Sequence, residues 1–265
     1  MLKKRIIPCL FLKNGFLARS EQFKQHQMLG DAIHQVERFN AWDVDELIYI
    51  DISEDEEYDT GRRDLKTQAN DNILAILEKV AKTCFIPLTF GGKIRTIEDI
   101  HARISRGADK VTLNTVALDN PAFIAQAANT FGSQAIIVSI DVRRHPDGHL
   151  EVFCDHGRQA KGRTPVEWAK EVEKLGAGEI FLNAIDRDGM ANGYDIDLIA
   201  RVAQAVNIPV IACGGIGRFE QMAAGITEGH ADAVAAGNIF HFTELSARRA
   251  RQTLLKMGVD VRSPG

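Results

Sequence analysis

Two glycine pairs in similar surroundings are the first residues whose type and spacing suggest chemistry. Gly91-Gly92 and Gly214-Gly215 each follow an apolar run. A small polar pair comes further along the chain in each case, Asn114-Thr115 after the first and Gly237-Asn238 after the second. Glycine lets the backbone approach a ligand closely, so peptide N–H groups can cradle an anion. Paired glycines also turn tight corners without binding anything. Because the arrangement occurs twice, we interpret it as two phosphate sites for a ligand with a phosphate at each end.

Acidic side chains follow two other apolar runs. Asp141 ends the run 135–141, where it could act as a general acid or base, since partial burial moves the pKa of a carboxyl towards neutrality. A helix cap or a turn is the alternative role for this residue. Asp186-Arg187-Asp188-Gly189 offers two more carboxylates, and its glycine indicates a tight turn. We expect one of these carboxylates to orient loops or ligand hydroxyls.

Four charged residues stand at the other end of such runs. Each precedes or begins an apolar segment, and they are Arg5, Glu46, Lys110 and Glu179. If all four point inward, they form a ring of two positive and two negative charges. Such a ring is either a salt-bridged plug that closes the core or a gate that opens when the charges exchange partners.

The elements that must position these residues alternate along the chain. Apolar, strand-like segments are separated by segments with helical spacing. The expected strands are 5–12, 46–52, 87–90, 110–114, 135–141, 179–183, 209–213 and 233–236. Parallel strands need a crossover helix between them, so eight such units predict an α/β fold, the (β/α)₈ TIM barrel. A doubly wound open sheet is the competing fold, and it would more often carry a glycine-rich fingerprint after its first strand.

An internal repeat supports the barrel. Phe90–Arg95 matches Cys213–Arg218, and Gly107–Val111 matches His230–Val234 at the same offset. We therefore expect one barrel domain over residues 1–265, built from half-barrels of about 1–130 and 131–265. The repeat also pairs Phe11 with Asp141 as equivalent positions at the ends of the first and fifth strands.

Composition excludes several classes of protein. Apolar residues make up 45% and charged residues 26% of the 265 residues, which is typical of a globular protein. The formal net charge is −4, whereas nucleic-acid binders usually carry a basic excess. No apolar run reaches the ~18 residues of a membrane span. The four cysteines lack metal-ligand spacing and indicate a reducing, cytoplasmic location.

Several stretches resemble the cyclase subunit of imidazole glycerol phosphate synthase, an enzyme of histidine biosynthesis. They include Lys4–Leu10, Arg106–Val111, Gly176–Ile180, Ile185–Gly189 and Phe240–Phe242. The resemblance covers essentially the whole chain.

This resemblance implies that the two faces of the barrel have different roles. A glutaminase subunit docks on the N-terminal face, and ammonia passes through the charged gate to a bisphosphorylated nucleotide at the top. Arg5, Glu46, Lys110 and Glu179 match the gate, Asp109 and Gln134 match the glutaminase interface, and Asp141 matches one of two catalytic aspartates. No metal or organic cofactor is implied.

The chain departs from the family pattern on the catalytic face. Phe11 stands where the second catalytic aspartate is expected, and a phenyl ring cannot transfer a proton. Arg19 replaces a functional lysine, Lys93 a cradle glycine and Asn14 an acidic residue. The gate residues are unchanged.

This asymmetry favours a divergent paralogue that delivers ammonia in surface-polysaccharide synthesis. It would work with a glutaminase and an ATP-dependent amidotransferase that forms an acetamidino sugar. The alternative is a true cyclase in which Asp141, with Asp186 or Asp188, carries out both proton transfers. A sugar-phosphate isomerase fits less well because it would need acids at both strand ends, and a non-catalytic docking protein is a further alternative.

Overall fold

Eight parallel strands close into a barrel in the computed structural model, which describes residues 3–42, 44–54, 58, 72–242 and 244–263. The barrel strands, in chain order, are β1 Arg5–Lys13, β4 Leu47–Asp51, β5 Leu88–Gly91, β6 Lys110–Leu113, β7 Ile136–Arg144, β10 Glu179–Ala184, β11 Val210–Cys213 and β12 Ala233–Ala236. Strand β1 pairs with β12 and β4, and β10 pairs with both β7 and β11, so the sheet has no open edge among these strands. The predicted (β/α)₈ barrel of the α/β class is confirmed.

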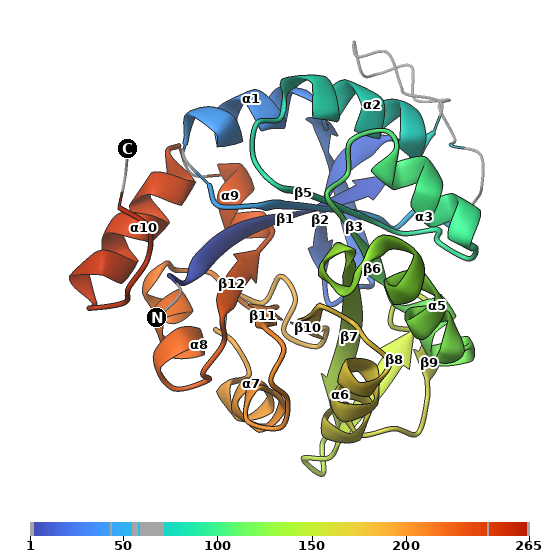
Figure 1. Cartoon of the computed structure of the whole chain (residues 1–265). Helices are drawn as coiled ribbons and strands as arrows, with labels where there is room; N and C mark the ends of the chain where they lie inside the picture. Colours follow the sequence, from blue (N-terminus) through green and yellow to red (C-terminus); the bar gives the residue numbers. More distant parts are fainter. Residues whose placement is uncertain (1–2, 43, 55–57, 59–71, 243, 264–265) are drawn as a thin grey trace.

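Helices cover the outside of this barrel and form a ring around the strands in Figure 1. They are α1 His34–Ala41, α2 Ile73–Thr83, α3 Ile97–Ile104, α4 Thr115–Asp119, α5 Ala122–Phe131, α6 Pro165–Lys174, α7 Ile196–Ala203, α8 Glu220–Thr227, α9 Asn238–Phe242 and α10 Ser246–Lys256, with a 3₁₀ turn at Ser133–Ala135. Helices α2, α3, α6 and α7 begin at a side chain that accepts a hydrogen bond from the first turn. Thr96 and Asp99 form a capping box at α3, and Thr164 caps α6 just before Pro165.

Two antiparallel additions to the barrel were not expected from the sequence. Strands β2 Phe16–Glu21 and β3 Gln25–Asp31 extend from β1, and β8 Leu150–Cys154 and β9 Gln159–Ala160 extend from β7. Strand β3 in particular is mostly polar and half-exposed, so it lacks the alternation by which strands are predicted. Both additions lie in the loops after strands β1 and β7, at the C-terminal face of the barrel.

The apolar core consists of two clusters because successive strand residues point to opposite faces. Ile7, Cys9 and Phe11 of β1 belong to a cluster that also includes Ile137 of β7 and Phe181 of β10. Side chains from such distant strands can meet only inside the barrel. The second, larger cluster lies between the strands and the helices. Since Arg5 has the same parity as Ile7, it too points towards the barrel axis.

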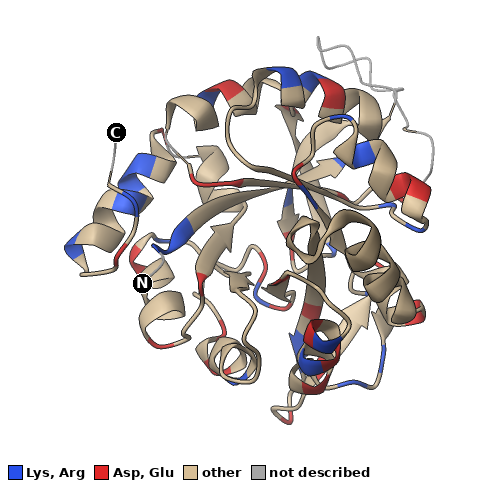
Figure 2. Cartoon of the chain, in the orientation of Figure 1, with Lys and Arg blue, Asp and Glu red and all other residues tan. Residues whose placement is uncertain are grey.

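The remaining sequence expectations concern the surface and the cysteines. Within the described residues, no helix combines the length and the apolar character needed to cross a membrane. All four cysteines are free, and Cys9, Cys154 and Cys213 are buried. Basic and acidic segments are interspersed on the surrounding helices, as Figure 2 shows. The division into two half-barrels stays a prediction.

Candidate functional site

Two cavities open at the C-terminal ends of the barrel strands, and Phe11 lines both of them. The larger has a volume of about 450 Å³ and the smaller about 250 Å³. Phe11 is only 4% exposed and packs edge-on against Phe23, with ring centroids 5.6 Å apart. An aromatic pair therefore stands at the boundary between the cavities.

Asp141 is the buried acid of the larger cavity. Its Oδ1 accepts hydrogen bonds from Ser139 Oγ at 3.2 Å and Asn183 Nδ2 at 3.4 Å, and its Oδ2 accepts one from Asn114 Nδ2 at 3.3 Å. Burial raises the pKa of Asp141 to about 7, although the bonds from Asn183 and Ser139 act in the opposite direction. A carboxyl with this pKa can both donate and accept a proton near neutral pH.

The smaller cavity is surrounded by glycine backbone. The residues predicted from the sequence that line it are Asp188, Gly189, Gly214, Gly215, Gly237 and Asn238. Gly214 and Gly215 both have φ near +99°, and a Cβ on Gly215 would lie 2.3 Å from the carbonyl oxygen of Gly193. No other residue fits this backbone, which leaves the cavity wall bare of side chains at that point.

Asp188 supplies a carboxyl to the same cavity. Burial raises its pKa, against the opposing hydrogen bond from the Phe23 backbone, whose N–H lies 3.4 Å from Oδ2. The negative charge of Asp188 also contributes to the raised pKa of Asp141. Asp188 therefore influences Asp141 although the two carboxyls line different cavities.

The far wall of the larger cavity carries a lysine next to a glycine. A Cβ on Gly92 would lie 2.2 Å from the carbonyl oxygen of Asp51, so a side chain is excluded at that position. The ammonium group of Lys93 lies 3.8 Å from Asp51 Oδ2 and 5.2 Å from the centre of the Tyr58 ring. Tyr58 donates its hydroxyl hydrogen to the same carboxylate oxygen at 2.9 Å. Lys93 thus brings a positive charge to this cavity wall.

The four charged residues at the opposite end of the barrel meet as predicted from their positions. Arg5 contacts Glu46 at 2.5 Å and Glu179 at 3.2 Å, and Lys110 contacts the same two carboxylates at 3.3 and 2.8 Å. Each cation thus touches both anions, in a closed ring that is largely buried. Burial alone would lower the pKa of Arg5, but the attraction of Glu46 and Glu179 outweighs it and raises that pKa. We call these four residues the charge ring.

Two further residues occupy the same N-terminal face. Asp109 is exposed, and its Oδ2 accepts a hydrogen bond from the Leu88 N–H at 2.8 Å, which ties the start of β6 to β5. Gln134 is exposed in the 3₁₀ turn just before β7. Both positions are accessible to a partner on this face.

The structure does not bring every predicted residue to a cavity. Gly92, Asn114 and Thr115 line the larger cavity with Asp141. Arg19 lies outside both linings, where its guanidinium contacts Glu21 at 3.3 Å. Gly91 ends β5 against Thr112, where a Cβ would lie only 2.5 Å from the methyl carbon of that side chain.

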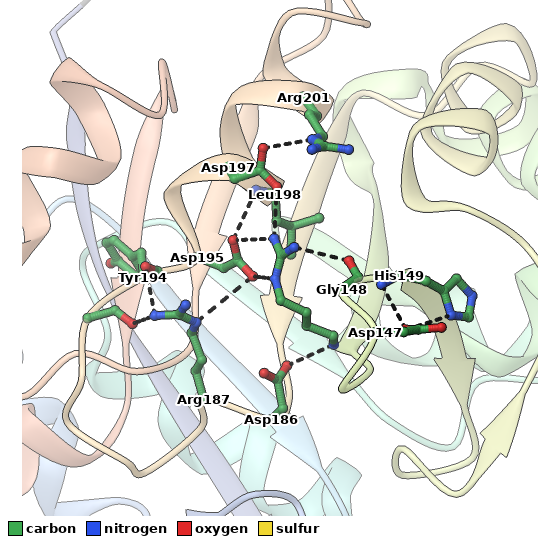
Figure 3. A network of polar contacts seen from close by, with 12 residues as sticks. Asp147, Gly148, His149, Asp186, Arg187, Tyr194, Asp195, Asp197, Leu198 and Arg201 are labelled. Atoms are coloured by element: carbon green, nitrogen blue, oxygen red, sulfur yellow. Dashed lines mark hydrogen bonds and ion pairs between the residues drawn. The ribbon is translucent and has the colours of Figure 1, made fainter.

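Asp186 also lies outside the two linings. Its Oδ1 faces the backbone N–H of Arg144 at 3.4 Å, so it orients the loop rather than the ligand (Figure 3). Of the two acids in the Asp186–Gly189 turn, only Asp188 lines a cavity.

Sequence reasoning missed the polar groups that hold Asp141. Asn183 is paired with Asp141 in the register of β10 and β7, and Ser139 lies two residues before Asp141 on the same face of β7. The alternation within β7 could have identified Ser139. Asn183 could be identified only from the pairing of β10 with β7, which the sequence does not give. Asp51 and Phe23 were missed for the same reason, because their cavity contacts join elements that are distant in sequence.

The architecture defines an α/β-barrel protein with two cavities at the mouth of the barrel, a buried acid in the larger of them, and a ring of paired charges at the other end. Residues 5–246 match the family described as histidine biosynthesis protein, and the chain belongs to this family. It is similar to the imidazole glycerol phosphate synthase subunit HisF of Alkaliphilus metalliredigens (strain QYMF), with 41% identity over 264 residues, which cover 99% of this chain and all of the relative.

Proposed function

We propose that this chain is the cyclase subunit of an imidazole glycerol phosphate synthase and receives its ammonia from a glutaminase. The high identity to a HisF subunit along the whole chain supports this function over a role in polysaccharide synthesis. The structural observation that carries it is the placement of buried Asp141 and partly buried Asp188, two carboxyls with raised pKa values that line the two cavities meeting at Phe11.

Cyclisation with ammonia requires groups that take up and release protons near neutral pH. Asp141, with a pKa of about 7, is such a group. The second proton-transferring group cannot be Phe11, and we assign this role to Asp188, which lines the neighbouring cavity next to that ring. Asp186 is not suitable, because it faces the Arg144 backbone outside the cavities.

The ligand is a molecule with a phosphate at each end. One phosphate would bind the glycine backbone around Gly214 and Gly215, and the other would bind near Gly92 and Lys93 in the larger cavity. A ligand that fills both cavities must pass over Phe11, so this ring contacts the middle of the ligand and excludes water from it.

Ammonia would enter from the opposite face. The charge ring closes the N-terminal end, and the barrel interior beyond it is lined by apolar groups such as Ile7, Ile137 and Phe181. Neutral ammonia can cross such an interior, whereas an ammonium ion would lose its hydration. A glutaminase docked on this face, near Asp109 and Gln134, would release ammonia next to the ring.

The test uses the purified chain alone, with ammonium chloride as the ammonia source and the bisphosphorylated nucleotide substrate. We expect imidazole glycerol phosphate to form. Asp188→Asn should lower the rate by roughly 10²- to 10⁴-fold, the usual contribution of a general acid or base. Asp186→Asn is the matched control, two residues away and outside the cavities, and should keep most of the activity. Equal losses in both variants would contradict the assignment of Asp188.

Phe11 favours a second candidate, the delivery of ammonia to an acceptor on another protein. In that case the wild-type chain would form no imidazole glycerol phosphate, while it would still bind a glutaminase and stimulate glutamine-dependent amidation by an ATP-dependent amidotransferase. Phe11→Asp separates the two candidates, because only a chain that has lost its cyclase acid gains substantial activity from the new carboxyl.

A further inference from the structure

A cluster of two imidazoles and a carboxylate lies outside both cavities, on the hairpin that joins β7 to β8. It consists of His145, His149 and Glu151. The three potential ligand atoms lie within 4.8 Å of one another, and no other group of histidine, cysteine or acidic side chains in the described part of the chain meets this criterion. The cluster has no part in the function proposed above.

The hairpin geometry explains why these three side chains converge. His149 and Glu151 are two residues apart, so they point to the same face of the hairpin. The N–H of His145 donates to the carbonyl oxygen of His149 at 2.8 Å, which places His145 directly across from it on that face. The two rings stack with centroids 4.6 Å apart, and His145 Nε2 lies 2.9 Å from Glu151 Oε2.

The cluster is also held in position by its surroundings. The Glu151 side chain is only 15% exposed, and its other oxygen accepts a hydrogen bond from the Gly162 N–H at 3.0 Å. The residue before His145, Arg144, contacts both carboxylate oxygens of Asp195 at 2.8 Å and Asp197 at 2.9 Å. Figure 3 shows His149 and Asp147 at the hairpin tip beside this network of Asp195, Asp197 and Arg201.

The positive charge of Arg143 is directed away from the three side chains. Arg143 lies on the same face of the hairpin, but its guanidinium is stacked 4.5 Å from the centre of the Phe153 ring and donates to the Gly157 carbonyl oxygen at 3.1 Å. Exposed Asp147, whose Oδ1 lies 3.9 Å from His149 Nδ1, adds a negative charge at the open side.

We propose that His145, His149 and Glu151 bind one divalent transition-metal ion, with Zn²⁺ as the best fit. Two neutral imidazoles and one carboxylate form a ligand set that zinc prefers, with at least one position left to water. Mg²⁺ and Ca²⁺ prefer oxygen ligands and would bind poorly here. The ligands come from both sides of the hairpin, His145 just after β7 and Glu151 in β8, so the ion would fix its tip next to the Arg144 network.

Isothermal titration of the full-length chain with Zn²⁺ at pH 7.5 tests this site. We expect one ion per chain, with affinity reduced about tenfold or more by His149→Ala and by Glu151→Gln. His34→Ala is the matched control, because it removes another exposed histidine beside an acid, Asp31 at 3.7 Å, and should leave the affinity unchanged. Absence of saturable binding, equal affinity in wild type and His149→Ala, or full competition by Ca²⁺ would overturn the proposal.

Thermal unfolding gives a second measurement that does not depend on any catalytic activity. A bound ion stabilises the folded chain, so Zn²⁺ should raise the melting temperature of the wild type but not of His149→Ala. Since His149 is half-exposed, this variant should fold normally without zinc. An equal zinc-dependent rise in both proteins would place the ion elsewhere.

Discussion

The stability of the Asp141→Asn variant relative to the wild type should increase as the pH rises from 5 to 8. The ordinary pKa of this carboxyl is 3.8, and burial raises it to about 7 in the folded chain. Between these two pH values the folded chain keeps a proton that the unfolded chain has released. Stability of the wild type therefore falls as pH rises through this window, and below it both states are protonated.

The size of the effect follows from the pKa difference. One pKa unit corresponds to about 1.4 kcal/mol, so ionisation of the buried carboxyl costs roughly 4 kcal/mol once the pH exceeds the folded-state pKa. Asparagine has no such cost. The free energy of unfolding of Asp141→Asn minus that of the wild type should therefore grow by roughly 2 to 3 kcal/mol from pH 5 to pH 8.

Urea unfolding at a series of pH values measures this difference. The amide introduced by Asp141→Asn would face the Asn114 amide, which adds a fixed penalty, but a penalty that does not vary with pH cancels from the trend. Asn183→Ala is the matched control: it keeps the carboxyl and removes a hydrogen bond that lowers its pKa, so the pH dependence should extend to higher pH. A difference between Asp141→Asn and wild type that stays constant over this range would refute the reasoning.

Three further predictions concern other parts of the molecule. Arg144→Ala should cost about 3 kcal/mol of unfolding free energy at pH 7, because buried Asp195 loses the cation that hydrogen-bonds to both of its oxygens and keeps Arg187 at 3.9 Å. Burial alone would raise the pKa of Asp195, but the Arg144 hydrogen bonds outweigh it and lower that pKa. The stability difference between wild type and Arg144→Ala should therefore shrink as the pH falls below about 4, which urea unfolding at a series of pH values would measure. Lys93→Met should weaken binding of the bisphosphorylated ligand by about ten- to a hundredfold in calorimetric titrations. An unchanged affinity would mean that Lys93 pairs with Asp51 without contacting the ligand. Phe85 is 88% exposed and lies just before β5, on the N-terminal face. Phe85→Ser should therefore change the free energy of unfolding by less than about 0.5 kcal/mol, yet weaken glutaminase binding about thirtyfold in pull-down or titration experiments. Unaltered binding would exclude Phe85 from the interface.

Much of the barrel was determined by local pattern in the sequence. Apolar runs separated by helical segments specify parallel strands with crossover helices. Eight such strands close into a barrel, in which the first and last strands pair with each other and no strand edge is left unpaired. The charge ring was predictable for the same reason. Arg5, Lys110 and Glu179 each begin a strand and Glu46 comes just before one, so alternation alone directs them towards the axis at one end.

Tertiary structure decided which residues share the functional site. Asp186 and Asp188 are two residues apart in one turn, and only the folded loop shows that Asp188 lines a cavity while Asp186 faces the Arg144 backbone. The pKa of Asp141 depends in the same way on its burial and on Asn183. A sequence records which residues follow one another, but it does not record the strand register and loop contacts that set the distances between charges. Those distances and the exclusion of water fix the chemistry, and only the closed barrel provides them.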